Sequence, residues 1–141
     1  MSRLPCLLVI LLAACGPSGP SEPFHGEWRV ASAITPGVSA VSTTDAGRQV
    51  GVLVSLQPGR GRVGDRTCDG AVYTRRALSA QTFVEAYRVT PQQLSLTGDP
   101  IPLVDVTCEN GGLELGSTLV VKSDQEMLTM WDGAFYLLTR N

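Results

Sequence analysis

The sequence predicts an all-β fold, a small antiparallel β-barrel of about eight strands with one or two short helical turns. Short runs alternate between apolar and polar side chains, and Gly, Pro, Asn or Asp separates them. The chain has 141 residues, of which 43% are hydrophobic and 17% charged, which suits one small packed domain. Closure into a barrel would remove the exposed edges that so many short strands otherwise present.

The strands follow from this period-two pattern. The clearest is Gln49–Leu56, in which every second residue is apolar and which ends at Pro58-Gly59. Asp132-Gly133 predicts a tight hairpin turn, because a type I′ turn needs positive φ at both central positions. The remaining predicted strands are Gly26–Ala33, Gly70–Arg76, Thr82–Val89, Ile101–Cys108, Leu113–Val121, Glu126–Trp131 and Ala134–Arg140.

Two short segments have helical signals. Thr44-Asp45-Ala46 places a capping residue before a short polar turn. Thr90–Leu94 places Thr90 at an N-cap and Pro91 at the first helical position, where a missing N–H costs nothing. Both segments are too short to build a helical domain. We interpret Gly59–Arg62 as a loop beside the Gly70–Arg76 strand.

Residues 1–14 have the features of a signal peptide. Arg3 provides a positive charge, and Leu4–Ala14 forms an apolar stretch. This stretch is too short for a membrane-spanning helix, which needs about 20 residues. No later stretch is longer, so we expect a mature chain without a membrane span, with its folded domain at residues 24–141.

The leader ends in Leu12-Ala13-Ala14-Cys15, which resembles the lipobox of bacterial lipoproteins. The resemblance implies diacylglyceryl transfer to Cys15, cleavage before it and acylation of the new amine. Several acyl chains on one residue would anchor the protein stably in a membrane. Gly16 follows, and by the sorting rule of that family it favours the outer membrane, facing the periplasm, over the inner membrane. An ordinary signal peptide with a chance cysteine is the alternative.

Residues 15–23 are expected to form the lipidated N-terminus and a tether. Gly16–Pro23 reads GPSGPSEP, a composition that forms neither a helix nor a paired strand. Such a tether reaches about 16 Å as a coil and about 25 Å as a polyproline helix. It would hold the domain just above the lipid headgroups.

The four cysteines are not equivalent. Cys6 would leave with the leader and Cys15 would carry lipid. Cys68 and Cys108 remain, and in an oxidising export compartment we expect them to form a disulfide. Two free buried thiols or a redox pair are the alternatives, although neither cysteine is in a Cys-x-x-Cys motif.

Composition and motifs argue against several functions. A net charge of −2 argues against a nucleic-acid binder. His25 is the only histidine and has no metal-ligand spacing around it, so we expect a surface or cap residue and no metal or cofactor site. The chain has no Gly-x-Ser-x-Gly elbow and no phosphate-binding loop. We therefore expect no enzymatic activity.

Positive charge is concentrated in one part of the chain. Arginine side chains there are suited to bind phosphate or carboxylate groups, so they form a candidate binding patch. The alternative is a solvated loop whose arginines keep an edge strand soluble. The residues of this candidate patch are Arg60, Arg62, Arg66, Arg75 and Arg76.

Short motifs resemble those of small β-barrel families. Gly26-Glu27-Trp28, with Arg140 on the last strand, resembles the Gly-x-Trp strand and closing arginine of lipocalins. This resemblance implies a barrel-end pair in which Arg140 lies across Trp28. Phe24–Val30 is similar to the opening of META-domain proteins, and Gly70-Ala71-Val72-Tyr73 to part of a motif of lipoprotein inhibitors of lysozyme.

These observations predict an exported, lipid-anchored envelope protein that acts as a non-enzymatic binding or accessory module, of the inhibitor or envelope-maintenance type. Its expected partners are the membrane, through acyl chains on Cys15, and an envelope protein or anionic envelope component, through the arginines. The alternative is a lipocalin-like carrier of a small apolar ligand in the barrel interior. We expect the aromatic residues to form core and barrel-end plugs.

Overall fold

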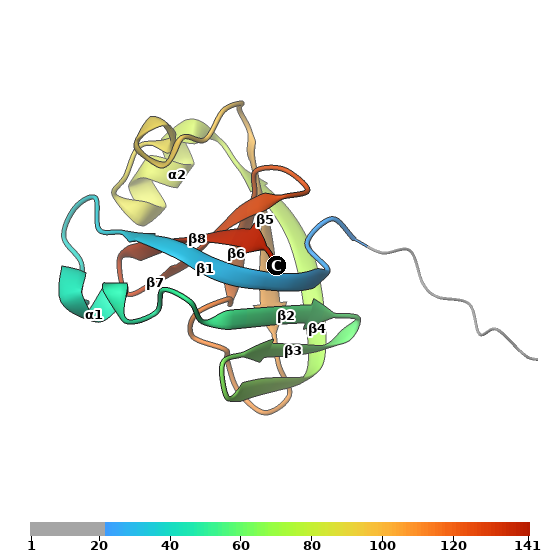
Figure 1. Ribbon diagram of the computed structural model, residues 1–141. Coiled ribbons are helices and arrows are strands. Elements are labelled where there is room, and N and C mark those ends of the chain that lie inside the picture. Colours follow the sequence, from blue (N-terminus) through green and yellow to red (C-terminus); the bar gives the residue numbers. More distant parts are fainter. Residues whose placement is uncertain (1–21) are drawn as a thin grey trace, which may run out of the picture.

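A computed structural model of the protein describes residues 22–141. The signal peptide expected at residues 1–14, the lipid site at Cys15 and most of the tether lie outside these residues. The described chain forms a closed, antiparallel, eight-stranded barrel, in which each strand pairs with its neighbours in sequence and the last pairs with the first (Figure 1). The predicted all-β barrel is thus confirmed.

The connections between strands include three short helical segments. None of the helices within residues 22–141 has the length and apolar character to cross a bilayer. The helices are α1 (Thr43–Gly47), α2 (Ala80–Tyr87) and the 3-10 helix η1 (Pro91–Leu94). The strands are β1 (Gly26–Ile34), β2 (Leu53–Gln57), β3 (Gly59–Val63), β4 (Arg66–Leu78), β5 (Ile101–Thr107), β6 (Thr118–Val121), β7 (Glu126–Trp131) and β8 (Ala134–Arg140).

Local signals account for the helical segments and the final turn. Ser42 and Thr90 cap α1 and η1, and Thr90 forms a reciprocal capping box with Gln93. Both predicted helical turns are therefore confirmed. Asp132 and Gly133 have φ of 51° and 80°, which matches the predicted hairpin turn between β7 and β8.

The prediction of a strand at Thr82–Val89 is wrong, because this segment lies largely in the helix α2. Ser79 begins the helix by accepting a hydrogen bond from the Thr82 N–H, and Arg88 ends it in the left-handed conformation. Phe83 and Tyr87 are four residues apart, a spacing that fits one face of a helix as well as one face of a strand. Their rings lie 4.8 Å apart, and Phe83 is fully buried.

Other boundaries also differ from the prediction, and the strand predicted at Gly70–Arg76 extends over Arg66–Leu78 as β4. Gln49–Gly51 forms a turn, so that β2 begins only at Leu53. Gly59–Val63 is strand β3 and not a loop, because Pro58 and Gly59 turn the chain back onto β2. Of the strand predicted at Leu113–Val121, only Thr118–Val121 is β6. The number of strands still agrees because one predicted strand is a helix and β3 replaces it.

Large side chains fill the barrel interior. Trp28 and Tyr136 are fully buried there, and Phe24 closes one end of the barrel beneath the N-terminal segment. Leu113 and Leu115, from the connection between β5 and β6, belong to the same cluster. The other interior residues include Val30, Val54, Leu56, Val63, Cys68, Ala71, Val104, Val106, Leu119, Met127 and Leu138.

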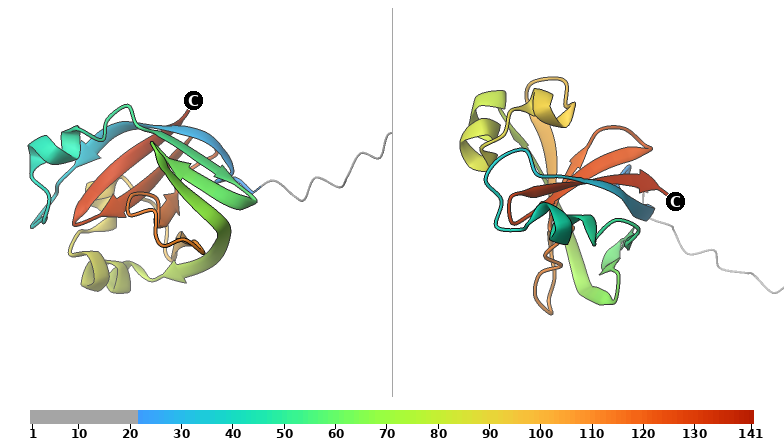
Figure 2. Two further views of the ribbon diagram at one scale, coloured as in Figure 1. Left: turned by 90° about the horizontal axis from the view of Figure 1, so that it is seen from below. Right: turned by 60° about the vertical axis from the view of Figure 1, so that its left-hand side comes forward.

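A second core lies on the outside of the barrel. There α2 and η1 cover one wall, and Phe83 packs with the outward side chains of that wall. Figures 1 and 2 show these helices on one side and β2 and β3 on the other. One wall of the barrel is therefore buried on both faces, while β2 and β3 are buried only on their inner face. The other members of this second core include Val89, Leu94, Leu96, Ile101, Leu103, Val120, Leu128, Met130 and Phe135.

The predicted disulfide is confirmed. Cys68 on β4 is bonded to Cys108, which follows β5, with their Cα atoms 5.1 Å apart. Cys68 is fully buried in the interior core. The bond ties the start of β4 to the end of β5, at the end of the barrel opposite Phe24.

Candidate functional site

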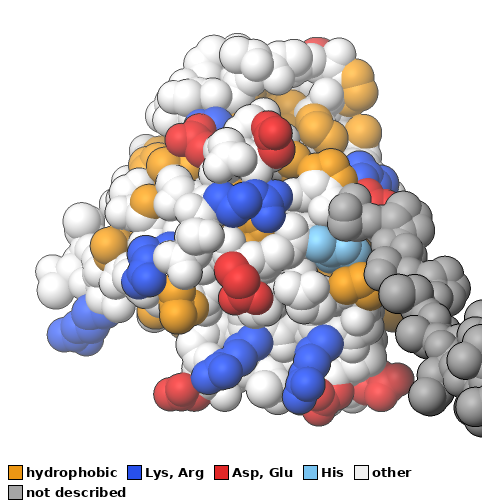
Figure 3. Space-filling view, turned by 45° about the vertical axis from the view of Figure 1, so that its right-hand side comes forward, with side chains coloured by type: hydrophobic (Ala, Val, Ile, Leu, Met, Phe, Trp, Pro, Cys, Tyr) orange, Lys and Arg blue, Asp and Glu red, His pale blue; other side chains and the backbone are white. Residues whose placement is uncertain are grey.

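The outer face of β1–β3 carries a row of polar side chains. Register pairs Glu27 with Ser55 and Ser55 with Arg62, so that these three side chains lie side by side across three strands. Gln57 and Arg60 form the next pair of the same face. Figure 3 shows acidic and basic side chains mixed on this side of the molecule. We call the surface formed by Glu27, Ser55, Gln57, Arg60 and Arg62 the polar face.

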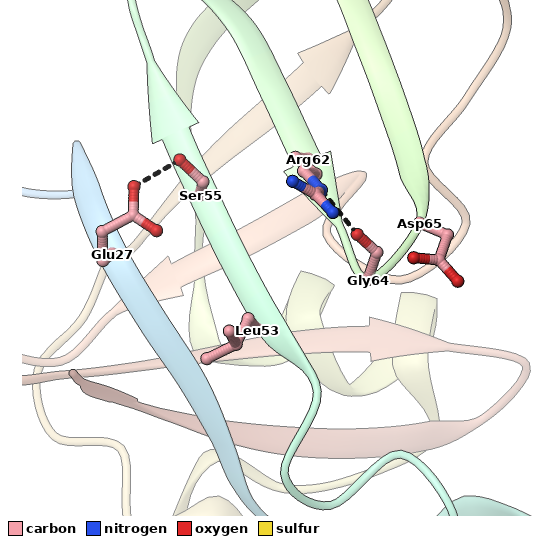
Figure 4. Close-up of a pocket in the computed structure, with 6 residues that line it drawn as sticks. All are labelled: Glu27, Leu53, Ser55, Arg62, Gly64 and Asp65. Atoms are coloured by element: carbon pink, nitrogen blue, oxygen red, sulfur yellow. Dashed lines mark hydrogen bonds between the residues drawn. The ribbon is translucent and has the colours of Figure 1, made fainter.

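An open hollow of about 510 Å3 lies on the polar face (Figure 4). Ser55 donates a hydrogen bond to Glu27, and Arg62 Nε donates one of 2.7 Å to the Gly64 carbonyl. The Gly64 contact fixes the guanidinium, whose terminal nitrogens form no hydrogen bond to residues 22–141. A fixed, open guanidinium can bind a carboxylate or phosphate through two parallel hydrogen bonds. The hollow is lined by Glu27, Leu53, Ser55, Arg62, Gly64 and Asp65.

The structure brings only part of the candidate arginine patch together. Arg60 and Arg62 both line a second hollow of the polar face, of about 310 Å3. Arg66, in contrast, forms an ion pair of 2.8 Å with Glu114. Arg75 and Arg76 are consecutive on β4, so their side chains point to opposite faces of the sheet. The polar face therefore retains Arg60 and Arg62 as its cations.

Arg76 belongs to a structural network. Its guanidinium donates to both carboxylate oxygens of Asp105 on β5, at 2.5 and 3.3 Å, and to the hydroxyl of Tyr87 on α2 at 3.0 Å. Thr118 of β6 also donates to Asp105 at 3.0 Å. The hydrogen bond from Arg76 holds the pKa of Asp105 below its ordinary value, although partial burial opposes this. The network joins three strands to α2 and leaves little of Arg76 for a ligand.

Trp28 and Arg140 meet at the closed end of the barrel. The Arg140 guanidinium carbon lies 4.2 Å from the centre of the Trp28 ring, a cation–π geometry. Arg140 also donates to the carbonyls of Pro23, His25 and Asp124, at 2.7, 2.9 and 2.7 Å. Trp28 Nε1 donates to the Phe24 carbonyl at 2.9 Å. These contacts fasten the N-terminal segment across the barrel end, so the pair has a structural role.

An aromatic cluster at the same end was not predicted from the sequence. The rings of Phe24 and His25 each lie 5.0 Å from that of Tyr73 on β4. The Tyr73 hydroxyl lies 3.0 and 3.1 Å from the carbonyl oxygens of Gln57 and Arg60, which share its one proton, and burial raises the pKa of Tyr73 to about 12. These contacts join residues far apart in sequence, so only the barrel topology reveals them.

His25 accepts a hydrogen bond from the Glu22 N–H at its Nδ1, 3.2 Å away, and its buried Nε2 has no partner within residues 22–141. Burial lowers the pKa of His25, outweighing the opposite effect of the Glu22 carboxylate. The unfolded chain therefore binds a proton more readily than the folded chain in the range just below the ordinary value of 6.5. The contribution of His25 to stability is complete above that value and declines as the pH falls below it.

We expect His25→Asn to remove this part of the pH dependence. Asn retains an acceptor for the Glu22 N–H but does not titrate. Thermal unfolding of both proteins between about pH 7.5 and about pH 5.5, where most carboxylates remain ionised, measures the difference. The wild-type protein should lose more stability across this range than His25→Asn, and equal losses would contradict the assignment.

Comparison of the chain with protein-family models, with curated proteins and with solved structures found no match. Within residues 22–141 there is no group of three or more His, Cys, Asp or Glu side chains that could hold a metal ion. The fold and its surfaces therefore provide the basis for a functional proposal.

Proposed function

We propose that the protein is an exported, lipid-anchored envelope protein that binds a partner through the polar face and has no enzymatic activity. The lipobox ending at Cys15 supports the anchor. The described structure begins only seven residues later, at Glu22, so the anchor would lie within about 25 Å of the Phe24 end of the barrel. We place the protein at the outer membrane, facing the periplasm.

The filled barrel interior is the observation that carries the binding role. Trp28, Tyr136 and Phe24, each at most 2% exposed, occupy the space in which a barrel of this size would hold an apolar ligand. This packing favours a function on the surface over the carrier role. A binding surface needs free hydrogen-bonding groups, a hollow and access to solvent. The polar face has two exposed arginines and two hollows, and α2 and η1 cover a different wall of the barrel.

The test is recovery of partners from the native envelope. Chemical cross-linking of the lipidated protein in its own cells, followed by purification and mass spectrometry, should identify a protein or anionic envelope component. The variant Arg60→Ala/Arg62→Ala should lower that recovery about tenfold, the effect of losing charged hydrogen bonds. Arg48→Ala is the control, because Arg48 is also an exposed arginine but ends α1, pairs with Asp45 and is not part of the polar face.

The same preparation tests the anchor. The N-terminal peptide should begin at Cys15 and carry acyl groups. An unmodified Cys15, or a leader still attached to protein in the cytosol, would refute the anchor and the location. Equal recovery with the Arg60/Arg62 variant and with wild type would refute the polar face as the binding surface.

A further inference from the structure

Half of strand β4 has an edge that no other strand of the described chain pairs with. β4 is 13 residues long, but β3 pairs with it only between Arg66 and Ala71. From Val72 to Leu78, β4 pairs with β5 on one side, and within residues 22–141 it has no neighbouring strand on the other. Figure 1 shows β4 continuing past β3 toward α2.

The backbone of this edge is available. In an antiparallel ladder, alternate residues direct their N–H and C=O groups away from the paired strand. Within residues 22–141, no hydrogen bond outside the strand ladders reaches the backbone between Tyr73 and Leu78. Val72, Thr74, Arg75 and Ala77 are exposed, and Val72 is 58% exposed despite its apolar side chain. Such an edge can accept an added strand.

A hollow adjoins the edge where an added strand would place an inward side chain. It has a volume of about 560 Å3, and the aromatic cluster of Phe24, His25 and Tyr73 contributes to its walls. The turn at Pro58 and Gly59 forms another side. The aromatic walls suit an apolar side chain, and Arg75 lies at the same hollow.

The charges of the edge favour an acidic strand over a second copy of this chain. Arg75 and Arg76 are consecutive, so an antiparallel β4–β4 pair centred on them would place Arg75 of one copy opposite Arg76 of the other on each face of the sheet. Like charges directly opposite each other oppose self-pairing. The Arg75 side chain is 58% exposed, and its partner Glu22 lies on the N-terminal segment and is 38% exposed. A carboxylate of an incoming strand can therefore reach Arg75 at little desolvation cost.

We propose that the edge from Val72 to Ala77 binds an extended segment of a partner protein, with a carboxylate beside Arg75 and an apolar side chain in the aromatic hollow. This inference rests on the proposed binding function and names the kind of partner segment. The edge continues from the polar face through the β2–β3 turn, so one partner can contact both.

The experiment uses the whole lipidated protein in detergent and the capped hexapeptide Thr-Val-Thr-Glu-Thr-Val, whose Val and Glu side chains lie on the same face of a strand. Backbone amide signals between Tyr73 and Leu78 should shift saturably in NMR titrations. A peptide with Lys in place of Glu should bind about tenfold more weakly, as should a peptide N-methylated at alternate nitrogens, because each loses one element of recognition. Arg75→Glu should weaken binding of the acidic peptide to a similar extent, and Arg48→Glu should not.

Several results would overturn the proposal. These are no saturable shift at millimolar peptide, equal binding of the N-methylated peptide, or equal binding of the lysine peptide. Sedimentation of the protein as a dimer through this edge would assign it to a second copy instead. The assay requires neither an acylated Cys15 nor a native partner, so its failure is distinct from failure of the envelope experiment.

Discussion

Replacing both Cys68 and Cys108 with serine is expected to lower the free energy of unfolding by about 4 kcal/mol. The two residues are 40 positions apart, and their bond restricts the unfolded chain by closing a loop of that length. Small domains have only about 5–15 kcal/mol of net stability, so this loss is a large part of the total. The melting temperature should fall by on the order of 15 °C.

Thermal and urea unfolding of wild type and variant would measure this effect. Wild type under reducing conditions should approach the stability of the double variant, whereas the double variant should not respond to the reductant. Mass analysis after alkylation gives the oxidation state of the same preparation. Labelling of both cysteines in native material, or equal stability of the two proteins, would contradict a structural disulfide.

Trp28→Ala is expected to destabilise the protein by about 4 kcal/mol. Trp28 is fully buried at the closed end of the barrel, and its indole N–H holds the Phe24 carbonyl. Truncation opens a large cavity beneath Phe24 and leaves Arg140 without the ring over which it lies. Urea unfolding measures the loss, and a change below about 1 kcal/mol would mean that the site collapses around the missing ring.

A double-mutant cycle with Arg140→Met separates the contact between the two residues from their other roles. Met keeps much of the aliphatic chain but removes the charge and the hydrogen bonds to the three carbonyls. We expect a coupling energy of about 1 kcal/mol between Trp28 and Arg140, the range of a partly desolvated cation–π contact. Strict additivity would show that Arg140 acts only by fastening the N-terminal segment.

Much of the barrel could be predicted because period-two runs and turn residues act locally. β8, the Asp132-Gly133 turn and η1 each have their signal within a few adjacent residues. The sequence pattern does not reveal α2, because the spacing of Phe83 and Tyr87 fits both the helical and the strand period. Only the capping residue Ser79 distinguishes a helix from a strand here. Tertiary packing of Phe83 on the barrel then decides the outcome.

The candidate site was only partly predictable. Arg60 and Arg62 alternate with Gly61 in the sequence, so their common face follows once β3 is known to be a strand. The partners of the other arginines are distant in sequence: Glu22 is 53 positions from Arg75, and Asp105 is 29 positions from Arg76. The open edge of β4 depends on the unequal lengths of β3 and β4, which no local signal determines.

The double burial of one barrel wall has a consequence for how freely the sequence can vary. In β7, Met127 and Leu128 point to opposite sides, yet each is at most 1% exposed because the interior and the α2 side both bury them. A polar replacement of Met127 or Leu128 therefore costs stability unless the new group finds a hydrogen-bond partner, as the buried Thr129 does with Thr118 and Gly116. In contrast, β2 and β3 can exchange their outward residues at almost no cost in stability. The side of the molecule that presents the polar face, our proposed binding surface, is thus the one at which residues can vary while the scaffold stays intact.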